Sequence, residues 1–290
     1  MHIYVCVKQT PDSGSVYIDP ITGQLDVERF VQVLNPADAC AIEAAVRLKE
    51  QLGGSVTVLS LGPQEAEGAL RAALAIGADT ALRFWNEKAT TWGPFMIATT
   101  LAAYFQYTVT TPDLVLCGNT SSDWSSSIVG PALAEYLDMP QVTGVTQLTI
   151  EPNQEPIRLL VTRKLEHGYR ELLEVEKPLL LTVTADLNEP RYPSLPAHLA
   201  ALKANIPVLD PQSFLSANYE DVDEMTLLEM HTPRPRPHYV ATPNSHDSAY
   251  RRIGDIVSGG ATGRKARLIE GSPEELARTL VDFLKARGFV

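Results

Sequence analysis

Residues 113–131 have the sequence DLVLCGNTSSDWSSSIVGP, and this stretch carries the strongest indication of the fold. The apolar run from Asp113 to Cys117 predicts a buried strand, and residues 132–137, directly after the stretch, predict a helix. The glycine and hydroxyl residues in between lead to the helix start, where unpaired amide groups and the helix dipole favour a negative charge. The stretch therefore predicts an anion site, with Ser125, Ser126 and Ser127 as candidate donors to a phosphate.

Strands and helices alternate in the residues before this stretch. Strand-like runs at 3–7, 55–61 and 81–85 are separated by helical patterns at 36–50, 64–76 and 95–107. Asn35 and Pro36 form a typical helix start, and Gly77 a typical helix end. This order predicts an α/β fold: a parallel twisted sheet with helices on both faces, Rossmann-like and suited to a nucleotide.

The pattern changes after residue 140. Runs at 142–150, 157–163 and 169–175 predict antiparallel additions to the sheet, and residues 178–183 predict a further buried strand. A short helix is expected at 197–204, followed by an extended arm over 205–245 that is rich in proline and acidic residues. An amphipathic helix at 272–287 begins with a capping box formed by Ser272 and Glu275. We therefore expect three parts: a nucleotide-binding domain (1–190), a loop and helix (191–204) and a C-terminal arm ending in a helix (205–290).

The composition is that of an ordinary globular protein. The 290 residues are 44% hydrophobic and 20% charged, and the net charge of −11 argues against a broad nucleic-acid surface. The three cysteines form no C-x-x-C pair, which fits a reducing compartment. The first residues show no signal-peptide pattern, and no window has the roughly 18 apolar residues that span a bilayer. We expect a cytoplasmic protein without a membrane span.

Sequence motifs for catalysis are absent. There is no Walker A pattern, no G-x-G-x-x-G and no G-x-S-x-G, and the six histidines lack metal-ligand spacing. Residues 259–265 resemble a phosphate loop only superficially and predict a flexible glycine turn. Asp123 would repel a phosphate, so we expect it to cap the following helix or to bond a sugar hydroxyl. A nucleotide site without a catalytic group or a metal site indicates a protein that holds a cofactor rather than a hydrolase.

Several segments of the chain resemble the beta subunit of electron transfer flavoproteins, the EtfB/FixA family. Residues 35–50 are similar to the N-P-x-D-x-x-A-x-E helix start that is a hallmark of that family. Further segments follow in the family's order at 5–9, 59–63, 161–168 and 188–196, so the resemblance covers nearly the whole chain. The loop at 118–131 departs most, because Trp124 and three serines stand where other side chains are usual.

The resemblance implies an electron-carrier subunit with no catalytic residues of its own. It implies a heterodimer with an alpha subunit that holds most of the redox-active FAD, and electron exchange with a flavin-containing dehydrogenase, such as an acyl-CoA dehydrogenase, and an acceptor. This chain would hold AMP or a second FAD, and its C-terminal arm would pack on the alpha subunit. A stand-alone nucleotide-binding or nucleotide-hydrolysing protein of the same fold is the alternative.

The same resemblance assigns roles to individual positions. Leu195 would dock on the dehydrogenase. The adenosine pocket and the phosphate cradle together would consist of Cys6, Asn35, Asp38, Leu59, Leu61, Gly118, Asp123, Ser125, Ser126, Ser127 and Val129.

Overall fold

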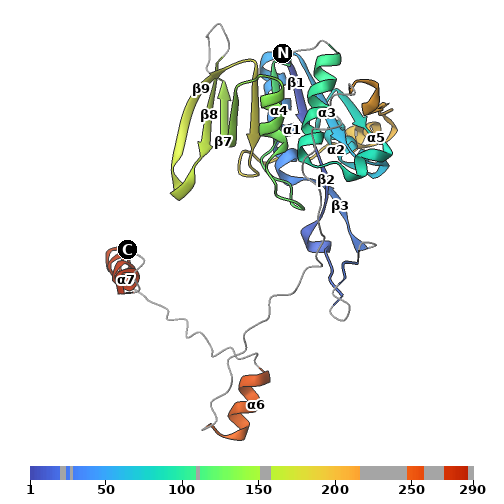
Figure 1. Ribbon diagram of the computed structural model, residues 1–290. Coiled ribbons are helices and arrows are strands. Elements are labelled where there is room, and N and C mark those ends of the chain that lie inside the picture. The colour runs from blue at the N-terminus through green and yellow to red at the C-terminus, as the bar shows by residue number, and fades with distance from the viewer. Residues whose placement is uncertain are drawn as a thin grey trace. The chain divides into compact units, whose positions relative to one another are not determined.

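The computed structural model describes residues 1–19, 24–26, 29–108, 112–150, 158–215, 247–257 and 271–286. The chain divides into two units, Met1–Pro233 and Arg234–Val290. The first unit contains the sheet and the helices that cover it (Figure 1), and the second contains two helices, α6 (Ala249–Val257) and α7 (Pro273–Ala286). None of the described helices combines the length and the apolar composition that crossing a membrane requires.

One nine-stranded sheet organises the first unit, in the spatial order β11-β5-β4-β1-β6-β10-β7-β8-β9. The strands from β11 to β7 are parallel to their neighbours, and β8 and β9 add in antiparallel fashion. The strands are β1 (His2–Cys6), β4 (Ser55–Leu61), β5 (Thr80–Phe84), β6 (Leu114–Gly118), β7 (Gln141–Ile150), β8 (Arg158–Lys164), β9 (Arg170–Glu176), β10 (Leu179–Val183) and β11 (Val208–Leu209). This architecture confirms the predicted α/β fold with antiparallel additions.

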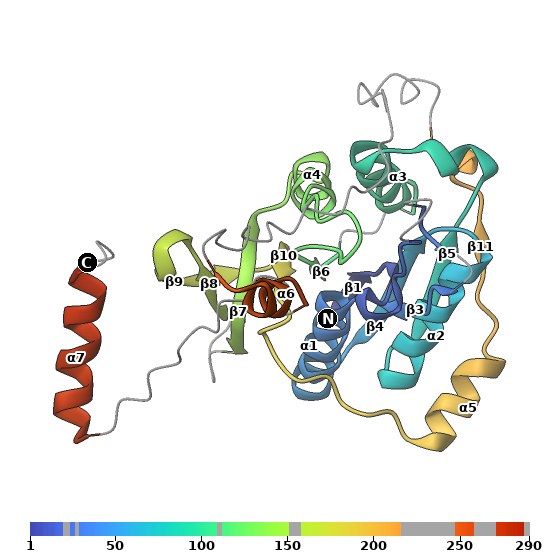
Figure 2. The same cartoon turned by 90° about the horizontal axis from the view of Figure 1, so that it is seen from below.

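Helices cover both faces of the parallel strands. Figure 2 shows α1 and α2 on one side of the sheet and α3 and α4 on the other. Two apolar cores result, one beneath each pair of helices, and every residue of β10 is buried because both faces are covered. The helices of this unit are α1 (Pro36–Leu52), α2 (Glu67–Ile76), α3 (Pro94–Tyr107), α4 (Val129–Tyr136) and α5 (Leu195–Lys203).

The ends of these helices follow the sequence signals in part. Gly77 ends α2 with a φ of 134°, as the glycine predicts. The predicted helix at 64–76 divides into a 3₁₀ turn, Gln64–Ala66, and α2. Helix α4 begins at Val129, three residues before the predicted start, so the run of serines lies outside the helix.

Strand order reverses between β1 and β6. From β1 the chain passes through α1 to β4 and through α2 to β5; it then crosses back through α3 to β6, on the other side of β1. The loops that leave β1 and β6 therefore turn to opposite faces of the sheet and leave a crevice at the carboxyl ends of these strands. Open parallel sheets bind ligands at such a point.

A small hairpin that the sequence patterns did not reveal leaves the body next to this point. Strands β2 (Gln9–Pro11) and β3 (Gln32–Leu34) pair antiparallel and extend away from the main sheet in Figure 1. Its base is fixed by the side chain of Gln9, whose Oε1 accepts a 3.0 Å hydrogen bond from the amide of Ala69 at the start of α2. The hairpin thus connects the end of β1 to the start of α1.

Residues 205–215 belong to the packed body, although the sequence predicted an extended arm from residue 205. Strand β11 pairs with β5, Ile206 is buried, and the ring of Phe214 packs against Phe84 and Tyr104. The rest of the predicted arm, up to residue 246, and the predicted glycine turn at 259–265 lie outside the described residues.

The second unit contains one predicted helix and one that was missed. In α7 the predicted capping box is confirmed, because Ser272 and Glu275 exchange side-chain and backbone hydrogen bonds of 3.0–3.4 Å. Helix α6 was not predicted, since the proline-rich and acidic residues before it suggested a continuous arm.

Candidate functional site

The carboxyl ends of β1, β4 and β6 bring together residues from distant parts of the sequence. Cys6 lies in register with Leu59 on one neighbouring strand and with Cys117 on the other. Leu61 ends β4, and Gly118 ends β6, so the predicted nucleotide residues of three strands meet at one edge of the sheet. The crevice at the reversal of strand order is therefore the candidate site.

The side chain of Asp38 joins the two strands that flank this crevice. Its Oδ2 accepts from the amide of Lys8 and its Oδ1 from the amide of Gly118, both at 2.8 Å. Asp38 is only 4% exposed, and burial raises its pKa to about 7, although the hydrogen bonds from Lys8, Asn35 and Gly118 act to lower it. The buried carboxylate therefore holds the ends of β1 and β6 at a fixed spacing.

The side chain of Asn35 holds the loop that follows β6. Its Nδ2 donates to the carbonyl oxygen of Thr120 at 2.9 Å, and its Oδ1 accepts from the amide of Ser122 at 3.2 Å. Asn35 occupies the predicted N-cap position before Pro36, but its side chain makes no capping bond to α1. The competing partners were invisible in the sequence because they lie more than 80 residues away.

Asp123 forms an ion pair with Lys8, whose Nζ lies 2.6 Å from its Oδ2. Its Oδ1 accepts from the amide of Trp124 at 2.8 Å. The predicted capping of the next helix is therefore wrong, and the alternative role, a bond to a sugar hydroxyl, stays a prediction. Burial acts to raise the pKa of Asp123, but the hydrogen bonds and charge of Lys8, with Ser121 and Trp124, hold it below its usual value. Lys8 is a site residue that sequence reasoning missed.

The run of serines forms an exposed turn with unusual backbone angles. Ser125 and Ser127 have left-handed φ values of 51° and 56°. Within the described chain, the amides of Ser126, Ser127, Ile128 and Val129 donate to no protein acceptor. Consecutive amides in such a turn, next to a helix start, form a concavity that binds anions. The predicted phosphate donors, Ser125, Ser126 and Ser127, therefore lie next to these unpaired amide groups, in the turn before α4.

Apolar side chains occupy the carboxyl ends of β1 and β4. Leu59 and Cys6 are buried, and Leu61 is half-buried. Burial, with a smaller effect of the Asp38 charge, raises the pKa of Cys6 to about 12, and burial raises that of Cys117 well above its usual value. Both thiols are therefore neutral and act as small apolar groups in the core.

Two further residues support the loop and had no signal in the sequence. The hydroxyl of Thr182, on β10, donates to Asn119 Oδ1 at 3.0 Å, and Thr10, in the hairpin, accepts from the hydroxyl of Ser122 at 2.9 Å.

A Cβ atom at Gly130 would lie 2.6 Å from Thr182 and 2.8 Å from the sulfur of Cys117, so only glycine lets α4 approach this closely. The loop is fixed on three sides by neighbouring elements.

Leu195 lies away from the crevice, at the start of α5. Its side chain is 70% exposed, beside exposed Tyr192 and Leu199. The hydroxyl of Ser194 caps the helix by accepting from the amide of Ala197 at 3.3 Å. Arg71 of α2 donates to three carbonyl groups near the end of α5, at 2.8–3.0 Å. Both ends of α5 are therefore held, and its apolar face is directed to solvent.

An ion-pair cluster attaches the segment before α5 to α1. The guanidinium and amide of Arg191 donate to Glu43 at 2.9–3.2 Å, and the guanidinium also contacts Glu50. Glu43 is only 1% exposed. Burial acts to raise its pKa, but Arg191 and Arg47 hold it below the usual value, so the carboxylate stays charged. The cluster fixes where the exposed face of α5 begins.

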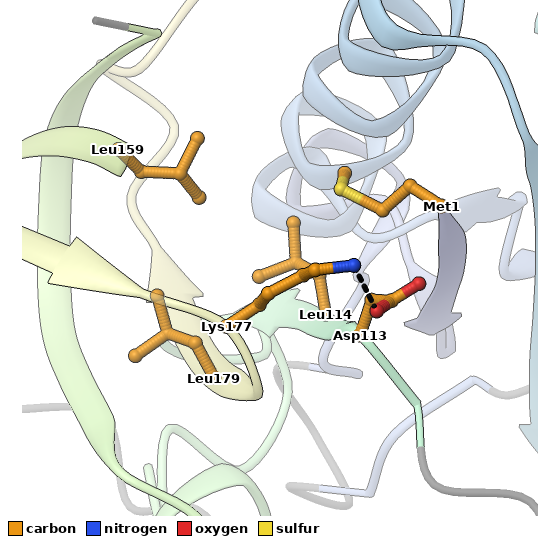
Figure 3. A pocket seen from close by; sticks show the side chains of 6 residues that line it. All are labelled: Met1, Asp113, Leu114, Leu159, Lys177 and Leu179. Carbon is orange, nitrogen blue, oxygen red and sulfur yellow. Dashed lines mark hydrogen bonds and ion pairs between the residues drawn. The ribbon is translucent and has the colours of Figure 1, made fainter. Parts of the chain in front are cut away.

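A small pocket lies at the opposite end of the sheet and is unrelated to the crevice. Figure 3 shows its lining, in which apolar side chains surround the ion pair between Lys177 and Asp113, 2.7 Å apart. Asp113 also accepts from the amide of His2 at 2.7 Å, so its charge is compensated. Apart from Leu159 of β8, these residues precede β1, β6 and β10 or begin them, whereas ligands of parallel sheets bind at the carboxyl ends.

Comparison with known proteins agrees with this geometry. Residues 23–213 match the family model described as electron transfer flavoprotein domain. The chain is 38% identical to electron transfer flavoprotein subunit beta of Thermoanaerobacterium thermosaccharolyticum, over 93% of this chain and 97% of that one. It is 31% identical to the subunit of the same name in Bacillus subtilis over the full length of both chains. It is also 38% identical to the caffeyl-CoA reductase-Etf complex subunit CarD of Acetobacterium woodii, over 77% of this chain and 80% of that one.

Proposed function

Since the chain belongs to the electron transfer flavoprotein family, in its beta-subunit branch, we propose that it holds an adenine nucleotide as one subunit of a flavin-dependent electron carrier. The nucleotide is AMP or a second FAD. The complex passes electrons between a flavin-containing dehydrogenase and an acceptor, and an alpha subunit holds the redox-active FAD.

One observation of the structure carries the nucleotide proposal. The amides of Ser126 to Val129, which have no protein acceptor in the described chain, lie at the carboxyl edge where strand order reverses. The donor set therefore fits a phosphate, and the apolar residues at the carboxyl ends of β1 and β4 suit a neighbouring adenosine. Asn35 and Asp38 contribute by holding the loop and the strand ends.

The residues of this chain bind and orient the nucleotide, and the described ones provide no reacting group at the crevice. When a flavin is bound, it supplies the electron-transfer chemistry. Asp38, Asn35 and Lys8 fix the loop before a ligand arrives, so little conformational entropy is lost when the ligand binds.

The exposed face of α5 is the proposed docking surface for the dehydrogenase, with Leu195 as its apolar anchor. A large exposed leucine on a rigid, capped helix costs little entropy to dock. The amphipathic α7, with its separate unit, is proposed to pack on the alpha subunit. That the A. woodii relative is named as a subunit of a reductase complex supports a multi-subunit assembly.

The nucleotide content of the purified complex tests this function. The chain is co-expressed with its alpha subunit, the complex is denatured, and the released nucleotides are separated and quantified. One FAD with one AMP per complex indicates a conventional carrier, and two FAD indicate a bifurcating one. A stable, colourless protein that hydrolyses ATP on its own would overturn the carrier function in favour of a stand-alone hydrolase.

A further inference from the structure

Lys8 contacts the crevice with both its backbone and its side chain. It follows β1 by two residues, and its amide donates to the buried carboxylate of Asp38 at 2.8 Å. Its ammonium group extends across the crevice to the loop after β6, where it lies 2.6 Å from Asp123 Oδ2. One residue at the end of the first strand thus reaches the loop that carries the unpaired amides.

The charges near this loop are unbalanced without Lys8. Asn35, Thr10 and Thr182 hold the loop through neutral side chains. Among the described residues that contact residues 118–123 through side-chain hydrogen bonds or ion pairs, Lys8 contributes the positive charge, whereas Asp123 within the loop and buried Asp38 are carboxyl groups. Asp123 stands three residues before the first unpaired amide, so its uncompensated charge would act against a phosphate.

We propose that Lys8 sets the charge of the phosphate site by neutralising Asp123, so that the loop accepts the anionic part of a nucleotide. This rests on the proposed function. Lys8 is a positioning residue here: it acts through Asp123 and requires no contact with the ligand. The proposal explains why a carboxylate is tolerated in a loop whose amide groups face an anion.

The experiment compares AMP with adenosine, which lacks the phosphate. Binding of each to the co-expressed, nucleotide-stripped complex is measured by titration calorimetry, with the same alpha subunit throughout. The variants are Lys8→Gln and the double variant Lys8→Gln with Asp123→Asn. Lys88→Gln, which removes the same charge from an exposed 3₁₀ turn (Glu87–Thr91), is the matched control.

We expect Lys8→Gln to weaken AMP binding about tenfold at low salt and to leave adenosine binding within about twofold. The double variant should recover most of the AMP affinity because it restores a neutral pair. The loss should shrink at high salt, where the repulsion is screened.

Three results would overturn the proposal. Equal losses for AMP and adenosine would mean that Lys8 serves only to hold the loop. A failure of the double variant to recover would mean that the charge of Asp123 is not the cause, and so would a loss that does not change with salt. If the unmodified complex bound neither AMP nor adenosine, the proposed function itself would fail, and this inference with it.

Discussion

The carboxylate of Asp38 lies 2.8 Å from the backbone nitrogen of Gly118, and this contact joins the start of α1 to the end of β6. A side chain at position 118 would occupy the same space, because its Cβ would lie 2.3 Å from Asp38 Oδ1 and 2.9 Å from the Cβ of Ala37. The glycine at the end of β6 is therefore required by packing, before any ligand is considered.

Gly118→Ala should destabilise the protein by about 2 kcal/mol, because α1 or β6 must shift to admit one methyl group. Urea unfolding of the purified complex measures the change. Gly14→Ala is the control, since its Cβ would meet the nearest atom at an ordinary 3.6 Å. Equal stabilities of the two variants would contradict the close contact at Gly118.

The pH dependence of stability should carry the signature of Asp38. Its folded pKa of about 7 lies above the usual value of 3.8, so between these values the folded state binds a proton that the unfolded state has lost. Stability from this group is therefore present at low pH and is lost as pH rises through about 7.

Asp38→Asn removes this titration. Its unfolding free energy should fall less than that of the unmodified protein between pH 5 and pH 7, by about 2 kcal/mol. The absolute stability of the variant is lower, because the Asn amide cannot accept both backbone hydrogen bonds. Parallel pH profiles of the two proteins would show that Asp38 does not titrate in this range.

Arg191→Ala should destabilise the protein by about 3 kcal/mol, because it leaves the buried carboxylate of Glu43 with Arg47 as its remaining partner. Chemical denaturation measures the effect. Arg158→Ala is the control: it also removes an arginine with two glutamate partners, but both of these glutamates are exposed, so it should cause little change. If both variants caused the same small loss of stability, the ion pairs of Arg191 would contribute little to the free energy of unfolding.

Leu195→Ser should leave the stability and nucleotide content of the complex unchanged, because the side chain is exposed. It should raise the KM for the complex in assays with its dehydrogenase several-fold, while reduction of the complex by a chemical reductant stays the same. Leu172→Ser, at an equally exposed leucine on β9, is the control. If both variants raised KM alike, a general loss of surface hydrophobicity would explain the effect.

Local sequence patterns predicted most of the elements, because their signals are short-range. Each of these signals depends on residues that lie within a few positions of one another. Examples are the apolar runs that form β6 and β10 and the helix-start signal at Pro36. The early start of α4 was missed because Ile128 and Val129 carry no capping signal. Residues 205–215 were assigned to the arm because β11 is only two residues long and is stabilised by pairing with β5.

The sequence by itself determined the α/β fold and predicted an anion-binding turn, since both inferences follow from periodicity and from the residue types between a strand and a helix. Only the tertiary structure decided what the polar side chains do. Asn35 and Asp123 both carry the chemistry of helix caps, yet they bond Thr120, Ser122 and Lys8 instead. The physical reason is that a hydrogen-bonding group takes the partner that folding brings within about 3 Å, and pairing of β1 with β6 brings together residues that lie more than 80 positions apart.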